Sequence, residues 1–147
     1  PFYLAAEWSS FMKIIVIDGQ GGKIGRTVIE QLKKRFPDQE LLAIGTNSIA
    51  TSSMLKAGAS QGATGENPIL VASRDADIII GPIAIVMADS LLGEITPSMA
   101  NAVSASRAYK ILIPTNRCNH YIAGCQEVSL SDAIQAVCDE VGRILTL

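Results

Sequence analysis

Residues 12–25 read MKIIVIDGQGGKIG, and this stretch decides the fold. Its first part, Lys13–Ile17, is a mostly β-branched run that is typical of a fully buried strand. A glycine-rich loop, Gly19–Gly25, comes next. Residues 26–36 then place apolar side chains at helical spacing and basic ones in the last turn, where the helix dipole favours cations. The stretch therefore predicts a strand, a tight loop and a helix in succession.

Strands and helices alternate along the rest of the chain. The expected strands are 40–45, 77–80 and 110–113, and the expected helices are 50–57, one opened by Asn67-Pro68, 83–92, 96–107 and 129–147. Residues 58–65 and 121–123 leave room for two further short strands. This alternation predicts an α/β protein, with a Rossmann-like, doubly wound, mainly parallel sheet in a single domain over residues 12–147. We expect the strand order 3-2-1-4, which places 110–113 beside the first strand.

The composition narrows the class of protein. A net charge of -2 without a basic run argues against nucleic-acid binding, which needs a concentrated positive face. Three cysteines make a disulfide framework unexpected and favour a cytoplasmic protein with reduced thiols. No apolar run reaches the roughly 18 residues that cross a membrane. We interpret residues 1–11 as a leader or an expression artefact, because a clean strand starts directly after Met12.

The glycine loop has the spacing G-x-x-G-x-x-G, formed by Gly19, Gly22 and Gly25 with Gly21 as an extra glycine. Between a strand and a helix, such a loop lets an anion approach the backbone N–H groups at the helix N-terminus. We therefore expect it to bind the phosphates of a nucleotide-type ligand, with NAD or NADP as possible cofactors. The alternative is a tight turn without a ligand. A Gly22→Val change is expected to abolish ligand binding and to leave the fold intact.

The proposed ligand site extends beyond the loop to the ends of neighbouring strands. NAD-binding proteins usually carry an acid at the end of the second strand, but this chain has Thr46 and Asn47 there. The loop also lacks the Lys-Ser/Thr pair of a P-loop. The expected cofactor-binding residues are Gly19, Gln20, Gly21, Gly22, Lys23, Ile24, Gly25, Arg26, Thr46, Asn47, Gly81, Pro82, Asn116 and Arg117.

A second polar cluster follows the strand at 110–113. Within it, Arg117 could grip a carboxylate or phosphate, Cys118 could act as a nucleophile, and His120 could act as an acid or base. These three residues are the catalytic candidates, and a solvated loop is the alternative. With the strand order expected above, this cluster faces the glycine loop. The cysteine and histidine spacing is no standard zinc pattern, so no metal site is expected.

From Met12 onward the chain resembles a family of small bacterial proteins catalogued as domain of unknown function 3842. The residues that carry the resemblance are MKIIVIDGQGGKIG at 12–25, DIIIGPIAIVMADSLLGEITP at 77–97 and ILIPTNRCN at 111–119. The resemblance implies a Rossmann-like fold and supplies no established reaction. The glycine block is also similar to the start of dihydrodipicolinate reductases, which implies a nicotinamide-nucleotide site. The sequence has no equivalent of the histidine-rich catalytic motif of those reductases.

Three functions remain open at this point. The first is a nucleotide-binding module without chemistry of its own. The second is a small NAD(P)-dependent oxidoreductase that holds an anionic substrate through Arg117, Asn116 and Asn119. The third is a homo-oligomeric protein without a ligand, assembled through the apolar residues 83–92. Homo-oligomerisation is expected in any of these cases, with a small-molecule ligand in the first two and neither nucleic acid nor membrane as a partner.

Overall fold

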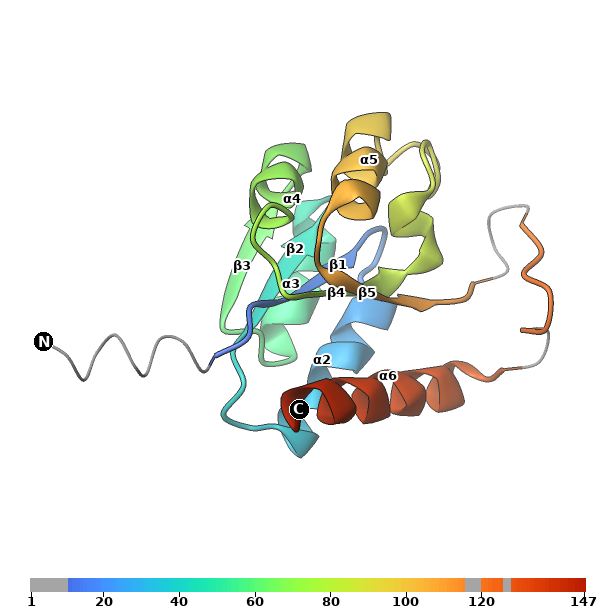
Figure 1. Ribbon diagram of the computed structural model, residues 1–147. Coiled ribbons are helices and arrows are strands. Elements are labelled where there is room, and N and C mark those ends of the chain that lie inside the picture. The colour runs from blue at the N-terminus through green and yellow to red at the C-terminus, as the bar shows by residue number, and fades with distance from the viewer. Residues whose placement is uncertain (1–10, 116–119, 126–127) are drawn as a thin grey trace, which may run out of the picture.

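The computed structural model describes residues 11–115, 120–125 and 128–147. Five parallel strands form one sheet in the order β3-β2-β1-β4-β5 (Figure 1). The strands are β1 Ile14–Asp18, β2 Leu41–Gly45, β3 Gln61–Thr64, β4 Ile78–Pro82 and β5 Tyr109–Ile113. The helices are α2 Lys23–Arg35, α3 Ser48–Lys56, α4 Glu66–Ala72, the 3₁₀ turn η1 Ile83–Val86, α5 Pro97–Ala105 and α6 Leu130–Leu145.

Helices cover both faces of the sheet, as expected for a doubly wound fold (Figure 1). One hydrophobic core packs alternate strand residues such as Val16 and Ile80 against α2, α3 and α6. The other core packs the intervening residues, such as Ile15 and Ile79, against α4, η1 and α5. All five residues of β1 and of β4 are buried, which explains why these central strands are continuous apolar runs rather than alternating ones.

The strand expected at 110–113 does not lie beside the first strand. Residues 61–64 form the strand β3, which takes the edge position next to β2. This leaves β4 to pair with β1 on its other side, and β5 pairs only with β4. The expected order was wrong in this respect because the short, exposed and glycine-containing β3 has almost no apolar signal. Residues 121–123 form no strand.

The helix expected at residues 83–92 was also wrong. Only Ile83–Val86 are helical, as a 3₁₀ turn, and residues 87–95 form a series of turns. Ala84 and Ile85 are fully buried in the core of their own chain. These two residues therefore pack inside the protein, whereas Leu92, at the end of the segment, is 97% exposed. The third functional hypothesis, assembly through residues 83–92, loses its helix and stays a prediction.

Polar side chains cap the N-termini of three helices. Asn47 caps α3 by accepting a hydrogen bond from Ala50 N, and Ser129 caps α6 through Asp132 N. Thr96 caps α5, with Pro97 in the first turn. The Thr96 hydroxyl accepts from Met99 N at 3.1 Å and donates to Glu66 Oε1 at 2.6 Å, so it also joins α5 to α4.

A Thr96→Val change is expected to lower the free energy of unfolding by about 1 kcal/mol, because it removes an N-cap acceptor while keeping the side-chain shape. Urea denaturation measures the difference. Thr27→Val is the matched control, since the Thr27 hydroxyl only bonds back to Lys23 O within its own helix. Equal losses for the two variants would contradict the assigned capping role.

Candidate functional site

The strand order reverses between β1 and β4, and ligands of open α/β sheets bind beyond the carboxyl ends of the strands at such a point. Here the loop Gly19–Gly25 follows β1, and Ile83 follows Gly81 and Pro82 at the end of β4. A Cβ on Gly81 would lie 2.5 Å from Ile17 O, so the two strand ends are in direct contact. The structure thus brings together the predicted glycine loop and the predicted Gly81-Pro82 pair.

Asp18, the last residue of β1, organises the loop. It is 5% exposed, and its carboxylate accepts hydrogen bonds from Gly19 N at 2.8 Å and from Gly25 N at 2.7 Å. The N-cap residue Gly22 has no side chain, so Asp18 supplies the capping oxygen for α2 from outside the helix. The sequence predicted a first strand that ends at Ile17, and Asp18 was not among the expected site residues.

The environment of Asp18 acts on its charge in two directions. Burial raises the pKa of the carboxyl group above its ordinary value and outweighs the hydrogen bonds from Gly25 and Gly19, which favour the charged form. The nearby carboxylate of Glu94 raises the pKa further. Asp18 is therefore a structural acceptor held in an environment that disfavours its ionised form.

The loop glycines serve different purposes. A Cβ on Gly19 would lie 2.7 Å from Thr46 Oγ1, and one on Gly25 would lie 2.5 Å from Met54 Sδ, so these two allow close packing of the protein itself. Gly22 has φ +72° and a Cβ there would lie 2.8 Å from Ala50 Cα. By contrast, a Cβ on Gly21 would meet nothing within 4 Å. Gly21 is the loop glycine that faces open space.

These contacts overturn the expectation that Gly22→Val leaves the fold intact. A β-branched residue is strained at a left-handed backbone angle, and the backbone of Ala50 leaves no room for its Cβ. Gly22 is required by the fold whether or not a ligand binds. A variant that probes the ligand alone has to be made at Gly21.

Glu94 reaches the loop from a distant part of the sequence. Its Oε1 atom accepts hydrogen bonds from Thr46 Oγ1 at 2.8 Å, from Asn47 Nδ2 at 2.7 Å and from Gln20 N at 3.1 Å. Among the described residues, the Oε2 atom accepts only a shared hydrogen bond from Gln20 N, at 3.2 Å. Thr46 and Asn47, expected to contact a ligand, thus hold an acidic side chain at the carboxyl end of β2.

Glu94 is held in its ionised form. Burial acts to raise its pKa, but the hydrogen bonds from Asn47, Thr46 and Gln20 together outweigh it and leave the pKa below its ordinary value. The carboxylate is therefore a permanent negative charge at neutral pH. Glu94 was not among the expected site residues, because an acid was sought at the end of the second strand, where NAD-binding proteins usually carry one.

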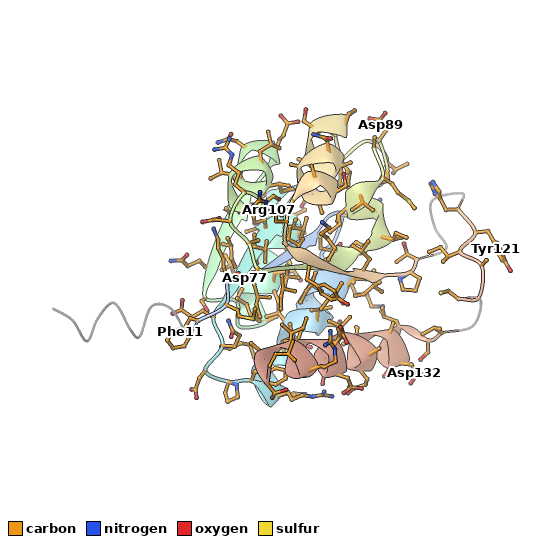
Figure 2. All side chains as sticks on the ribbon, in the orientation of Figure 1. Phe11, Asp77, Asp89, Arg107, Tyr121 and Asp132 are labelled. Atoms are coloured by element: carbon orange, nitrogen blue, oxygen red, sulfur yellow. The ribbon has the colours of Figure 1, made fainter. Side chains whose placement is uncertain are left out.

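The 87–95 loop that carries Glu94 is compact. Asp89 N donates to Ile95 O at 2.7 Å and closes it, while the buried Ser90 hydroxyl bonds to Ala84 O at 2.7 Å. Asp89, Leu91 and Leu92 all have left-handed φ angles between 54° and 64°. Three such non-glycine residues cost energy, and strain of this kind is retained where surrounding contacts enforce it. Figure 2 places Asp89 far from Phe11, at the opposite side of the molecule.

The two charged residues at the start of α2, Lys23 and Arg26, do not point into the loop. Lys23 and Arg26 are exposed on the first turn of α2, and Arg26 forms an ion pair with Glu30 at 3.0 Å. Within the described part of the chain, the N–H groups of Gly21 and Lys23 have no hydrogen-bond acceptor. These two N–H groups, beside the exposed Lys23 side chain, are the donors that the loop offers to a ligand.

We expected the second polar cluster to face the glycine loop from a neighbouring strand. The strand that it follows is not a neighbour of β1. The cluster follows β5, and β4 separates β5 from β1. Asn116, Arg117, Cys118 and Asn119 lie outside the described residues. His120 is exposed, and Tyr121 next to it lies well away from the sheet in Figure 2. The wrong expectation followed directly from the wrong strand order.

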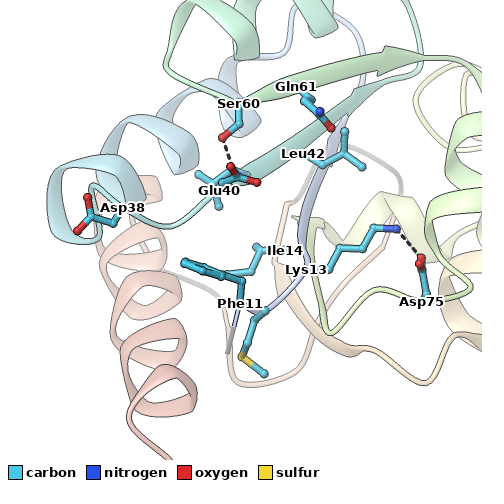
Figure 3. A pocket seen from close by; sticks show the side chains of 11 residues that line it. Phe11, Lys13, Ile14, Asp38, Glu40, Leu42, Ser60, Gln61 and Asp75 are labelled. Carbon is cyan, nitrogen blue, oxygen red and sulfur yellow. Dashed lines mark hydrogen bonds and ion pairs between the residues drawn. The ribbon is translucent and has the colours of Figure 1, made fainter. Parts of the chain in front are cut away.

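A hollow of about 790 Å³ lies at the other edge of the sheet (Figure 3). It is formed around the amino ends of β1, β2 and β3 by residues that include Phe11, Lys13 and Glu40. Lys13 and Asp75 form an ion pair on its wall. We do not assign it to the candidate site, because the glycine loop and Glu94 are at the carboxyl ends of the strands.

In the described ranges 11–115, 120–125 and 128–147, no helix has both the length and the apolar character to cross a bilayer. Nor does any group of three or more acidic, histidine or cysteine side chains in those ranges form a possible metal site.

The fold is similar to a solved crystal structure, that of a dodecameric FMN-dependent UbiX-like decarboxylase from Escherichia coli O157:H7. The TM-score is 0.50 at 15% sequence identity, over 92% of this chain and 96% of the decarboxylase chain. At this identity the similarity supports the fold alone. No curated protein sequence matches the chain. Residues 13–146 match the model of a sequence family, as the resemblance of the three sequence blocks implied. The chain belongs to this family, which is described as domain of unknown function (DUF3842).

Proposed function

We propose that this protein binds a nucleotide-type ligand at the carboxyl ends of β1 and β4, with a ligand phosphate on the N–H groups of Gly21 and Lys23. The observation that carries the proposal is the open space above Gly21 next to these two unpaired N–H groups. They lie at the N-terminus of the 13-residue helix α2, whose dipole favours an anion. The Lys23 side chain adds a positive charge at the same place.

The contact between Glu94 and the loop bears on anion binding in two ways, because it shows that a loop N–H can face a carboxylate and it also adds a negative charge that disfavours a second anion close by. A carboxylate already accepts the neighbouring Gln20 N–H, together with the side chains of Thr46 and Asn47. The loop therefore has a geometry in which a main-chain N–H faces a negative group. Asp18 takes the Gly25 N–H, which limits the phosphate to the outer part of the loop.

The ligand class is proposed from two sources. The strand, glycine loop and helix are typical of NAD or NADP sites. The similar E. coli decarboxylase is described as FMN-dependent, which makes FMN the second candidate. All three carry phosphate and sugar groups, so the same loop could serve each of them. The proposal is limited to binding and assigns no reaction.

Thermal denaturation with NAD, NADP or FMN tests the proposal. A ligand at a hundredfold excess over its dissociation constant adds about 2.7 kcal/mol of stability. We expect a rise of the melting temperature with at least one of the three. Gly21→Val should keep the melting temperature of the free protein and abolish the rise, because its side chain fills the space of the phosphate.

Lys56→Ala is the matched control, because it removes an exposed lysine from the last turn of α3, away from the loop. It should leave the ligand-induced rise unchanged. A Gly21→Val protein that responds to the ligand like the wild type would remove the loop from the binding site. No rise with any of the three nucleotides would overturn the proposed function.

We further propose that the protein self-associates, since the similar decarboxylase is described as dodecameric. Light scattering coupled to size-exclusion chromatography measures the mass of the particle in solution. A mass equal to that of one 15.5 kDa chain at micromolar concentration would contradict self-association.

A further inference from the structure

We infer that the Glu94 carboxylate accepts the ribose hydroxyls of the bound nucleotide and selects an unphosphorylated ribose, so that NAD is preferred to NADP. This inference rests on the proposed function, because it assigns one subsite of the proposed nucleotide site. The juxtaposition that carries it is a fixed carboxylate at the carboxyl end of β2, beside the glycine loop.

The two carboxylate oxygens have different tasks. Oε1 is saturated by Thr46, Asn47 and the Gln20 N–H, which fix the side chain. Oε2 has only a share of the Gln20 N–H, at 3.2 Å. An ionised carboxylate has about four acceptor positions, so Oε2 retains capacity for a hydroxyl donor. One oxygen thus anchors the group and the other is available to a ligand.

The position matches the chemistry. In doubly wound sheets that bind NAD, an acid at the end of the second strand accepts hydrogen bonds from the ribose 2′-hydroxyl. This chain has no acid on or directly after β2. Instead, Thr46 and Asn47 at that strand end bind an acid delivered by the 87–95 loop. Glu94, from the loop that follows β4 and η1, thus lies where the acid of the second strand would be.

The 87–95 loop can hold the carboxylate in place while a ligand binds. Ile95 and Ser90 are buried, and the Asp89–Ile95 and Ser90–Ala84 hydrogen bonds tie the loop to the protein. The left-handed residues Leu91 and Leu92 show that the backbone accepts strain to reach this geometry. A preorganised acceptor loses little entropy when a ligand arrives.

Charge explains the selectivity. A 2′-phosphate would bring a second negative group against the Glu94 carboxylate, which Thr46, Asn47 and Gln20 hold in place. Within the described residues, no lysine or arginine bonds to Glu94. Hydroxyl donors satisfy an ionised acceptor, whereas a phosphate repels it. The subsite is therefore suited to a neutral diol.

Isothermal titration of NAD and NADP tests the inference on the full chain. We expect the dissociation constant of the wild type for NAD to be at least about tenfold lower than that for NADP. One hydrogen bond to a charged group together with charge repulsion accounts for a ratio of this size. Glu94→Gln should weaken NAD binding and strengthen NADP binding, so that the ratio of the two dissociation constants falls by about tenfold or more. Circular dichroism confirms that the variant is folded.

Glu66→Gln is the matched control. Glu66 is another acid at the carboxyl edge, but it bonds to Thr96 rather than to the loop, so the ratio should not change. Equal weakening of both ligands by Glu94→Gln would mean that Glu94 only fastens the 87–95 loop, and would overturn the inference. An unchanged ratio, or binding of FMN alone, would also overturn it while nucleotide binding stands. If the wild type binds none of these nucleotides, the proposed function fails and the inference fails with it.

Discussion

Replacing Gly81 with alanine is expected to lower the free energy of unfolding by about 3 kcal/mol, at the upper end of the usual cost of overpacking a core. The added Cβ would lie 2.5 Å from Ile17 O and 2.9 Å from Ile85 Cδ1. The first contact is with the backbone of β1, which is hydrogen-bonded to β2 on its other side and cannot move away cheaply. The strands must therefore separate or the residue must distort.

A thermal melt measures this effect. For a chain of this size, 3 kcal/mol corresponds to a fall of roughly 6–12 °C in melting temperature. Gly21→Ala is the control, because its Cβ meets nothing within 4 Å and the residue lacks a positive φ. We expect that control to melt within about 2 °C of the wild type. Similar melting temperatures for Gly81→Ala and Gly21→Ala would contradict the assigned packing role of Gly81.

Replacing Asp18 with alanine is expected to cost about 2 kcal/mol at neutral pH. The change leaves the buried N–H groups of Gly19 and Gly25 without their acceptor, and each such group costs about 1–3 kcal/mol. Part of this loss is offset, because the variant no longer has to bury a carboxylate on folding. Urea denaturation at pH 7 measures the difference, and an unchanged midpoint would exclude Asp18 as the organiser of the loop.

The effect of Asp18 should also depend on pH with a definite sign. Burial raises its pKa in the folded protein above the ordinary value of 3.8, so the folded state holds the proton more tightly than the unfolded state. Its contribution to stability is therefore most favourable at low pH and declines as pH rises from 3.8 through the raised pKa. Relative to Asp18→Asn, the wild type should lose stability over this window.

Comparing the two proteins isolates Asp18 from other carboxyl groups. Glu94 and Glu140 have lowered pKa values, and the stability that they contribute is instead lost as pH falls. Glu140 is present in both proteins and cancels in the difference, whereas the electrostatic coupling between Glu94 and Asp18 is lost in Asp18→Asn and forms part of the measured difference. If the free energy of unfolding of the wild type increased with pH relative to that of Asp18→Asn, the result would contradict the raised pKa.

The sequence predicted most of the fold because its strongest signals are local. The buried runs of β1 and β4 and the helix start at Thr96 each depend on residues within one turn or strand. The strand β3 was less predictable, because its four residues QGAT have little apolar character and are held by pairing with β2. Missing it displaced every later strand in the expected order.

The candidate site was predictable only in part for the same reason. The loop Gly19–Gly25 is contiguous in sequence, whereas its contact with Glu94 joins residues 74 positions apart. One signal could have located Glu94. A helix start at Thr96, after a strand end at Pro82, confines residues 83–95 to the carboxyl edge of the sheet. Gly22 differs from Gly21 because the backbone of Ala50 lies against it. The sequence around the loop does not predict this long-range contact.

The carboxylate of Asp18 has a consequence for how the protein matures. Because the Asp18 carboxyl group accepts the Gly25 N–H in the first turn of α2 and the Gly19 N–H before it, the first crossover of the sheet contains its own acceptor for these two groups. The geometry of this crossover therefore does not depend on a bound anion, and the chain is expected to fold without a small molecule. Loading with a nucleotide would be a later and reversible event, governed by cellular concentration rather than by assembly of the fold.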